Sequence, residues 1–93
     1  MADEVRRNDA DERYELYVDG VLVGVADFEV RGESVVLPHT EIVARLRGQG
    51  FGDILVKGAL DDIRAAGRTV VPACWFVRQF LDLHPEYAAL RAA

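Results

Sequence analysis

The sequence predicts one α+β domain on a mixed sheet: an antiparallel meander, then a β-α-β unit and C-terminal helices. Three observations predict it. Alternating apolar residues flank Asp19-Gly20, which is typical of a β-hairpin. Residues 51–66 carry apolar side chains at helical period. A short apolar run at 68–71 follows, and a helical crossover makes the strands that it joins parallel. The 93 residues are the length of a single domain.

Composition excludes several classes of protein. The net charge of −5 and the pI near 4.9 argue against a nucleic-acid binder, which needs a basic surface. No apolar run approaches the roughly 20 residues of a membrane-spanning helix. One cysteine cannot form an internal disulfide, and the first dozen residues lack the apolar stretch of a secretory signal. We therefore expect a cytoplasmic protein without nucleic-acid or membrane partners.

The N-terminal half is predicted to be a charged tail followed by strands. Residues 1–11 are polar, without periodicity, and predict a flexible tail, so we place the domain at residues 12–93. The first two strands join at Asp19-Gly20, a pair that suits a type I′ turn. Pro38 is expected to separate a third strand from a fourth. The four predicted strands are residues 13–18, 21–30, 33–37 and 39–43.

The C-terminal half is predicted to alternate helix and strand. One helix covers residues 51–66, and Gly67 is suited to end it. A fifth strand at 68–71 should run parallel to the fourth. A second helix covers about residues 75–83, and a last short helix covers 86–90. We expect the aromatic residues of the second helix to lie in the core under the sheet: Trp75, Phe76 and Phe80.

A glycine-rich loop before the long helix is the most informative segment. Three glycines occur within residues 48–52, and Arg45 and Arg47 lie beside them. Free N–H groups at a helix N-terminus bind phosphate, and glycines let the backbone approach it closely. The Walker pattern is excluded because no Gly-Lys-Ser/Thr occurs. The Rossmann pattern is excluded because Asp53 stands where it needs glycine.

The pattern that does fit is Arg47-x-x-Gly50-x-Gly52, which resembles the acetyl-CoA signature of the GNAT N-acetyltransferase superfamily. The wider runs from His39 to Gly52, Pro72 to Val77 and His84 to Tyr87 resemble a group of short stand-alone GNAT-like domains, the YjdJ-type proteins. The resemblance covers roughly residues 13–90 and implies a minimal GNAT-like fold, in which the fourth and fifth strands splay apart.

The resemblance also implies a cofactor, acetyl-CoA, and the residues that bind it. Backbone N–H groups of the loop would hold its diphosphate, at Arg47, Gly48, Gln49, Gly50, Phe51 and Gly52. Ile42 and Val43 would offer strand backbone to the pantetheine arm, and Cys74 and Phe76 would form the other wall. The family's helical pair and C-terminal strands, which normally build the acceptor pocket, are replaced here by the Asp19-Gly20 turn and residues 86–90.

Three residues are candidates for the chemistry of acetyl transfer. His39 could act as general base, or it could simply cap its strand. Glu41, two residues along on the same strand face, could orient His39 or be the base itself. Cys74 could accept the acetyl group, or it could be a small buried side chain. We expect no metal site.

Three functions remain open on the sequence. The first is an N-acetyltransferase that moves an acetyl group from acetyl-CoA to an unidentified amine. The alternative is a non-catalytic module that binds acetyl-CoA or CoA. The third is an interaction domain whose glycine loop is only a turn. We expect a monomer or a weak homodimer.

Overall fold

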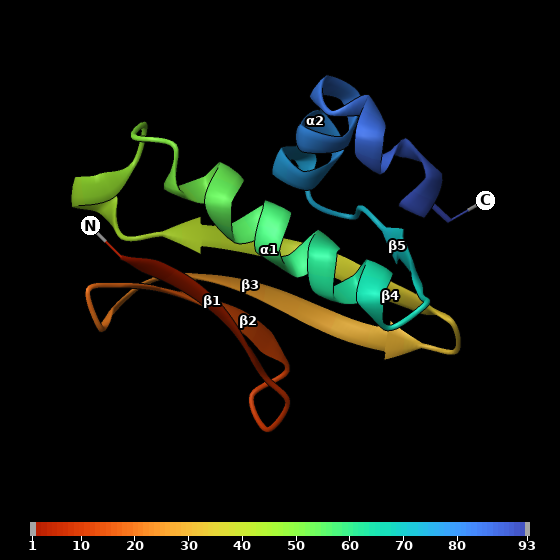
Figure 1. Cartoon of the computed structure of the whole chain (residues 1–93), viewed down its shortest axis with the longest axis horizontal. Helices are drawn as coiled ribbons and strands as arrows, with labels where there is room; N and C mark the ends of the chain where they lie inside the picture. The colour runs from red at the N-terminus through yellow and green to blue at the C-terminus, as the bar shows by residue number, and fades with distance from the viewer. Residues whose placement is uncertain (1, 93) are drawn as a thin grey trace.

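The computed structural model describes residues 2–92 and has one five-stranded sheet in the order β1-β2-β3-β4-β5 (Figure 1). The first four strands are antiparallel, and β5 is parallel to β4. The predicted α+β class, with its meander and β-α-β unit, is confirmed. The elements are β1 (Asp3–Asn8), β2 (Arg13–Val18), β3 (Val21–Arg31), β4 (Ser34–Ile42), the 3₁₀ turn η1 (Ala44–Leu46), α1 (Phe51–Ala65), β5 (Thr69–Val71), α2 (Trp75–Leu83) and the 3₁₀ helix η2 (Pro85–Leu90).

The prediction of a flexible tail over residues 1–11 is wrong for most of that segment. Asp3–Asn8 forms the edge strand β1 and pairs along its whole length with β2. The strand shows no alternation in sequence because its charged side chains are exposed. Val5 provides its apolar contact with the helix: a Cβ on Gly58 of α1 would lie 2.6 Å from Val5. A charged edge strand also resists pairing with another chain.

The predicted hairpin turn is confirmed, whereas the break at Pro38 is not. Asp19 and Gly20 both have positive φ, 50° and 80°, as a type I′ turn requires. Residues 33–37 and 39–43, predicted as two strands, belong largely to one strand, β4. Pro38 is exposed, and the register against β3 shifts between Asp27 and Glu29, so the strand accommodates proline at a bulge.

Helix α1 supplies the centre of the core. It packs against all five strands, crossing one face of the sheet (Figure 1). Its buried stripe has the predicted helical period and consists of Leu55, Val56, Ala59, Leu60 and Ile63. Alternate residues of the strands meet this stripe, among them Leu16, Val23, Leu37 and Val70. None of the helices within residues 2–92 is long and apolar enough to cross a membrane.

Strands β4 and β5 pair only at one end. Their pairing ends at Val36 with Val71, and one further hydrogen bond runs from the Cys74 N–H to the Leu37 carbonyl at 3.0 Å. Within residues 2–92, the remainder of β4 pairs with β3 alone. The chain after β5 turns away into α2, so the end of β4 and the start of α2 diverge. This divergence creates the space in which the candidate site lies.

Candidate functional site

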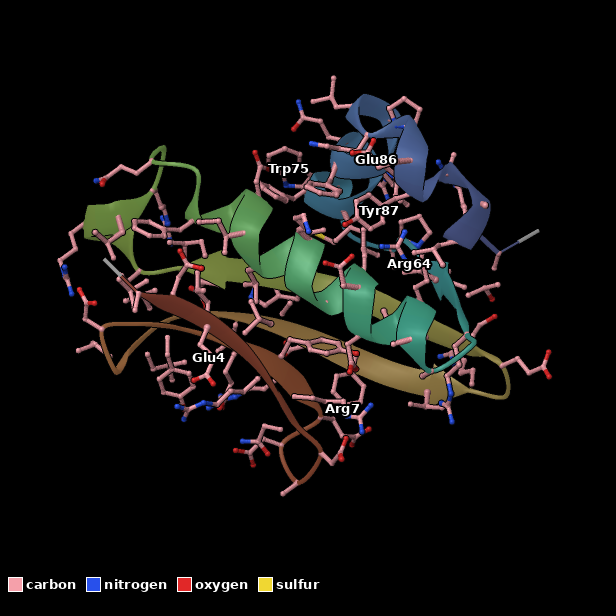
Figure 2. The ribbon with its side chains drawn as sticks, in the orientation of Figure 1. Glu4, Arg7, Arg64, Trp75, Glu86 and Tyr87 are labelled. Atoms are coloured by element: carbon pink, nitrogen blue, oxygen red, sulfur yellow. The ribbon has the colours of Figure 1, made fainter. Side chains whose placement is uncertain are left out.

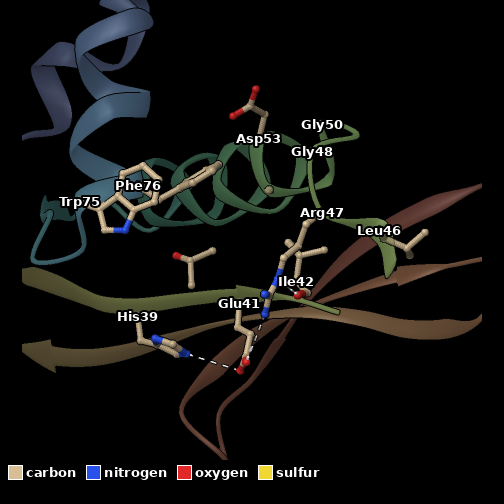
Figure 3. A pocket seen from close by; sticks show the side chains of 12 residues that line it. His39, Glu41, Ile42, Leu46, Arg47, Gly48, Gly50, Asp53, Trp75 and Phe76 are labelled. Carbon is tan, nitrogen blue, oxygen red and sulfur yellow. Dashed lines mark hydrogen bonds and ion pairs between the residues drawn. The ribbon is translucent and has the colours of Figure 1, made fainter. Parts of the chain in front are cut away.

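The site is a cavity of about 540 Å³ between the end of β4, the glycine loop and the start of α2 (Figure 3). The glycine loop and the N-terminus of α1 form one end, and His39 and Trp75 lie toward the other. The residues that line it are His39, Thr40, Glu41, Ile42, Leu46, Arg47, Gly48, Gly50, Gly52, Asp53, Trp75 and Phe76.

The glycine loop leaves the N-terminus of α1 open. Gly48 and Gly50 have φ of 80° and 87°, which glycine adopts without the steric cost that other residues bear. Gly50 is the N-cap residue, and no side chain within residues 2–92 caps the helix. The bond from the Ile54 N–H to the Gly50 carbonyl closes the first helical turn, so the N–H groups before it lack helical partners. These donors and the positive end of the helix dipole suit an anion.

Gly52 allows a close contact between the two helices. A Cβ at this position would lie 2.6 Å from the Phe76 ring, so any larger residue would push the ring away. Phe76 packs on the core from this position and lines the cavity. Gly52 therefore allows Phe76 of α2 to pack against the first turn of α1, in addition to any role of the Gly52 backbone N–H.

Arg47 brings a positive charge to the same end of the cavity. Its Nε donates a hydrogen bond to the Ile42 carbonyl at 2.9 Å, and a terminal nitrogen lies 3.9 Å from a Glu41 oxygen. The side chain is 61% exposed. The guanidinium is thus tied to the end of β4 while most of its donors face solvent or the cavity.

His39 and Glu41 lie on the same side of β4, as predicted. The His39 Nε2 is 3.6 Å from a Glu41 oxygen, within ion-pair range but longer than a hydrogen bond. Both side chains are more than half exposed. Thr40, between them, also lines the cavity, and its buried Oγ1 has no hydrogen-bond partner within residues 2–92. The strand thus provides two proton-accepting groups and one unsatisfied hydroxyl.

Most of the residues predicted for the site line this cavity, and four do not. Val43 lines a neighbouring hollow of about 500 Å³ on the β3 side. Gln49 folds back onto the Arg45 carbonyl at 3.4 Å. The Phe51 side chain is buried in the core. Cys74 is half-buried against the core.

Four lining residues were not predicted as site residues: Thr40, Leu46, Asp53 and Trp75. Trp75 was expected in the core and is instead 66% exposed, so that prediction is wrong, whereas Phe80 is buried as expected. The signal was present in the sequence. Trp75 lies about 200° around the helix from Val77 and therefore opposite the buried stripe. Asp53 is exposed in the first turn of α1, beside the loop, whereas in the sequence it served only to exclude the Rossmann pattern.

A family model described as GCN5-related N-acetyltransferase matches residues 13–90 of the chain. A search of curated proteins found no match. The sequence resemblance stated above is thus confirmed at the level of the family.

Solved structures share the fold at low sequence identity. A GCN5-like protein from Staphylococcus aureus, solved by NMR, matches 97% of this chain and 88% of its own with a TM-score of 0.72 and 17% identity. The ribosomal-protein-S18-alanine N-acetyltransferase from Escherichia coli matches 62% of this chain, with a TM-score of 0.58 and 19% identity; the match spans 38% of the enzyme. N-acetylglutamate synthase from Neisseria gonorrhoeae, solved with coenzyme A and N-acetyl-glutamate, matches 63% of this chain and 15% of its own, with a TM-score of 0.56 and 21% identity.

Proposed function

Because the chain belongs to the GCN5-related N-acetyltransferase family, we propose that it transfers an acetyl group from acetyl-CoA to an amine. The observation that carries the proposal is the cavity between the end of β4 and the start of α2, which begins at an uncapped helix N-terminus and extends to His39. Acetyl transfer is the activity of the Escherichia coli enzyme that shares this fold. The use of acetyl-CoA and the amine acceptor are the parts proposed here.

The glycine loop fits a diphosphate. Open N–H groups at the start of a 15-residue helix offer several donors to one anion, and Gly48 and Gly50 have no Cβ to obstruct it. Arg47 adds a full positive charge beside them. The Asp53 carboxylate in the first turn repels an anion, so the attraction must come from the backbone N–H groups and Arg47.

The rest of the cavity fits the remainder of the cofactor. Beyond Leu37 the edge of β4 toward α2 lacks a neighbouring strand within residues 2–92, so backbone groups there can hydrogen-bond an extended amide chain. The Ile42 carbonyl is already bonded to Arg47. Phe76 provides an apolar wall. When bound, acetyl-CoA supplies an acetyl carbon that is activated as a thioester.

His39 and Glu41 are proposed to accept the proton that the amine loses. An amine must lose a proton to become a nucleophile, and both side chains can accept one at the cavity wall. The Glu41 carboxylate lies 3.6 Å from the imidazole, a position from which it can orient His39 as base. Cys74 packs on the core outside the lining, which favours its structural interpretation over acceptance of the acetyl group.

A non-catalytic module that binds acetyl-CoA or CoA is the second candidate. It is favoured by the exposure of His39 and Glu41, whose side chains are more than half exposed rather than enclosed in the cavity. The two candidates share the cofactor site and differ only in turnover, so one set of experiments can separate them.

The test compares two glycines at opposite ends of α1. Gly50 and Gly67 both have positive φ, and a Cβ on either would meet no atom within 4 Å, so Gly50→Gln and Gly67→Gln impose similar strain. Acetyl-CoA at 100 times its Kd should stabilise the wild type by about 2.7 kcal/mol in a thermal unfolding experiment. We expect Gly67→Gln to keep that gain and Gly50→Gln to lose it.

The result separates the candidate functions. No gain in the wild type, or the same loss in both variants, contradicts the cofactor site. Release of free CoA thiol with a panel of amines then identifies an enzyme, whereas binding without release for every amine favours the module. An acetyl adduct on the intact protein that Cys74→Ala abolishes would restore the covalent role of Cys74.

A further inference from the structure

We propose that Trp75 selects the acceptor, and that the acceptor is a primary amine carried on an apolar, preferably aromatic, body. The inference rests on the proposed acetyl transfer and names the substrate class of the same cavity. The juxtaposition that carries it is an exposed indole at the end of the cavity where His39 and Glu41, on the far face of β4, also belong to the lining (Figure 3).

Trp75 is the exception among the aromatic side chains. The core contains Tyr14, Phe28, Phe51, Phe80 and Tyr87, whereas Trp75 is 66% exposed. A single exposed apolar side chain is ordinary, but an exposed indole that lines a cavity offers a large apolar surface to a ligand. Because Trp75 lines the cavity, the partner that it best fits is a ligand of that cavity.

The indole is held in place before any ligand binds. It meets the Phe76 ring edge-on, with centroids 5.7 Å apart and planes at 64°. Phe76 in turn is wedged against Gly52. Cys74, immediately before Trp75, is fixed to β4 through its N–H bond to the Leu37 carbonyl. A preorganised wall of this kind lowers the entropic cost of binding a flat ligand.

The β4 side of the lining determines the polarity of the ligand. His39 and Glu41 line the cavity at β4, with side chains that extend from the face of the strand away from Trp75, and the glycine loop lies at the other end (Figure 3). A molecule on the indole therefore meets apolar surface there and reaches a proton acceptor across the edge of β4. An amine on an apolar body matches both. A polyamine fits less well, because Glu41 is the one carboxylate of the lining near this end, and Asp53 lies at the loop.

The first test uses the fact that Trp75 is the only tryptophan of the chain, so that intrinsic fluorescence reports on this wall alone. The protein is saturated with CoA, which cannot transfer an acetyl group, and is then titrated with 2-phenylethylamine, ethanolamine or spermidine. We expect 2-phenylethylamine to change the emission at a concentration about tenfold lower than either other amine. An emission change with CoA but none with any amine, or saturation by spermidine or ethanolamine at the lowest concentration, would overturn the proposal.

The second test measures KM and kcat separately. Trp75→Ala should raise KM for 2-phenylethylamine about tenfold, with little change in kcat, and Trp75→Phe should restore most of the affinity. Leu83→Ala is the matched control, since Leu83 is a similarly exposed apolar residue on the same helix and does not line the cavity. Acetyl-CoA should stabilise all three variants as it does the wild type.

The two proposals fail in different ways. If acetyl-CoA does not stabilise the wild type, the proposed function fails. If acetyl-CoA stabilises every variant but Trp75→Ala leaves KM for 2-phenylethylamine unchanged, the assignment of Trp75 fails and the cofactor site stands.

Discussion

In the C-terminal half of helix α1 the Asp61 carboxylate makes short contacts with three partners, whereas near the N-terminal end the Glu41 carboxylate makes only long contacts. Asp61 accepts from Lys57 and Arg64 at 2.9 Å and from the Tyr87 hydroxyl at 2.6 Å. Figure 2 shows Arg64 beside Tyr87 at this end of the molecule. At the other end, Glu41 lies 3.6 Å from His39 and 3.9 Å from Arg47.

This difference distinguishes the side chains that stabilise the fold from the groups that remain available to bind a ligand. Satisfied carboxylates fasten α1 to neighbouring elements: Asp61 to η2 through Tyr87, and Asp62 to β1 and β2 through Arg7 and Tyr14. The N-terminal end keeps helix donors uncapped and a guanidinium largely exposed. Substitutions at the first end should therefore change stability, and those at the second should change ligand affinity.

The largest expected effect is on stability, at Asp61. Asp61→Ala leaves the hydroxyl of buried Tyr87 without its partner and should lower the free energy of unfolding by about 1–3 kcal/mol. Urea unfolding measures it. Asp82→Ala is the control, because Asp82 is 72% exposed and lies 3.7 Å from Arg91, so its loss should cost about 0.5 kcal/mol or less. If Asp61→Ala lost more free energy of acetyl-CoA binding than free energy of unfolding, the two ends of α1 would not have separate roles.

The next effect is on affinity, at Arg47. Arg47→Ala should weaken acetyl-CoA binding about tenfold, since it removes the cation that the cavity lining places beside the helix N-terminus. Arg45→Ala is the matched control: it removes the same charge from the same loop, but Arg45 is not in the lining. Calorimetry at low and high salt should show the difference between the variants shrinking as salt screens the charge. Equal losses in both variants would mean that only the net charge of the loop matters.

Periodicity predicted the fold well where one face of an element is buried, and failed where it is not. The stripe of α1 and the alternation of β2 follow directly from burial, and both elements were located. β1 was missed because an edge strand with exposed charges needs only Val5 to pack. Pro38 was overinterpreted, because a bulge lets a strand continue past a proline without an N–H to donate.

The site was predicted through backbone chemistry better than through side chains. Glycines in a strand-to-helix loop need a backbone reason, and Gly48 and Gly50 both have positive φ and line the cavity. The prediction for Trp75 was wrong because tryptophan near other aromatic residues is typical of a core, whereas its angle around α2 places it on the exposed side of the helix. Thr40 carries no sequence signal, since only the packing of β4 leaves its hydroxyl without a partner.

A smaller effect on affinity is expected at Asp53, in the first turn of α1. Its carboxylate stabilises the helix dipole but repels a bound diphosphate. Asp53→Asn should therefore tighten acetyl-CoA binding about two- to fivefold while slightly lowering stability in the absence of ligand. Calorimetry and urea unfolding measure the two effects. Weaker binding in Asp53→Asn would show instead that the carboxylate contacts the ligand favourably.

The smallest effect is the pH dependence at Asp61. Burial raises the pKa of Asp61, but hydrogen bonds from Tyr87 and Lys57 outweigh it and hold the pKa below its ordinary value. A carboxyl with a lower pKa in the folded state stabilises the protein above its unfolded pKa of about 3.9, and loses this contribution as the pH falls through the folded pKa. The side chain is 38% exposed, so solvent screening keeps the contribution small. Urea unfolding between pH 7 and pH 2 should show wild type and Asp61→Asn converging below about pH 4. A gap that stays constant over the whole range would mean that the Asp61 contacts contribute through geometry and not through charge.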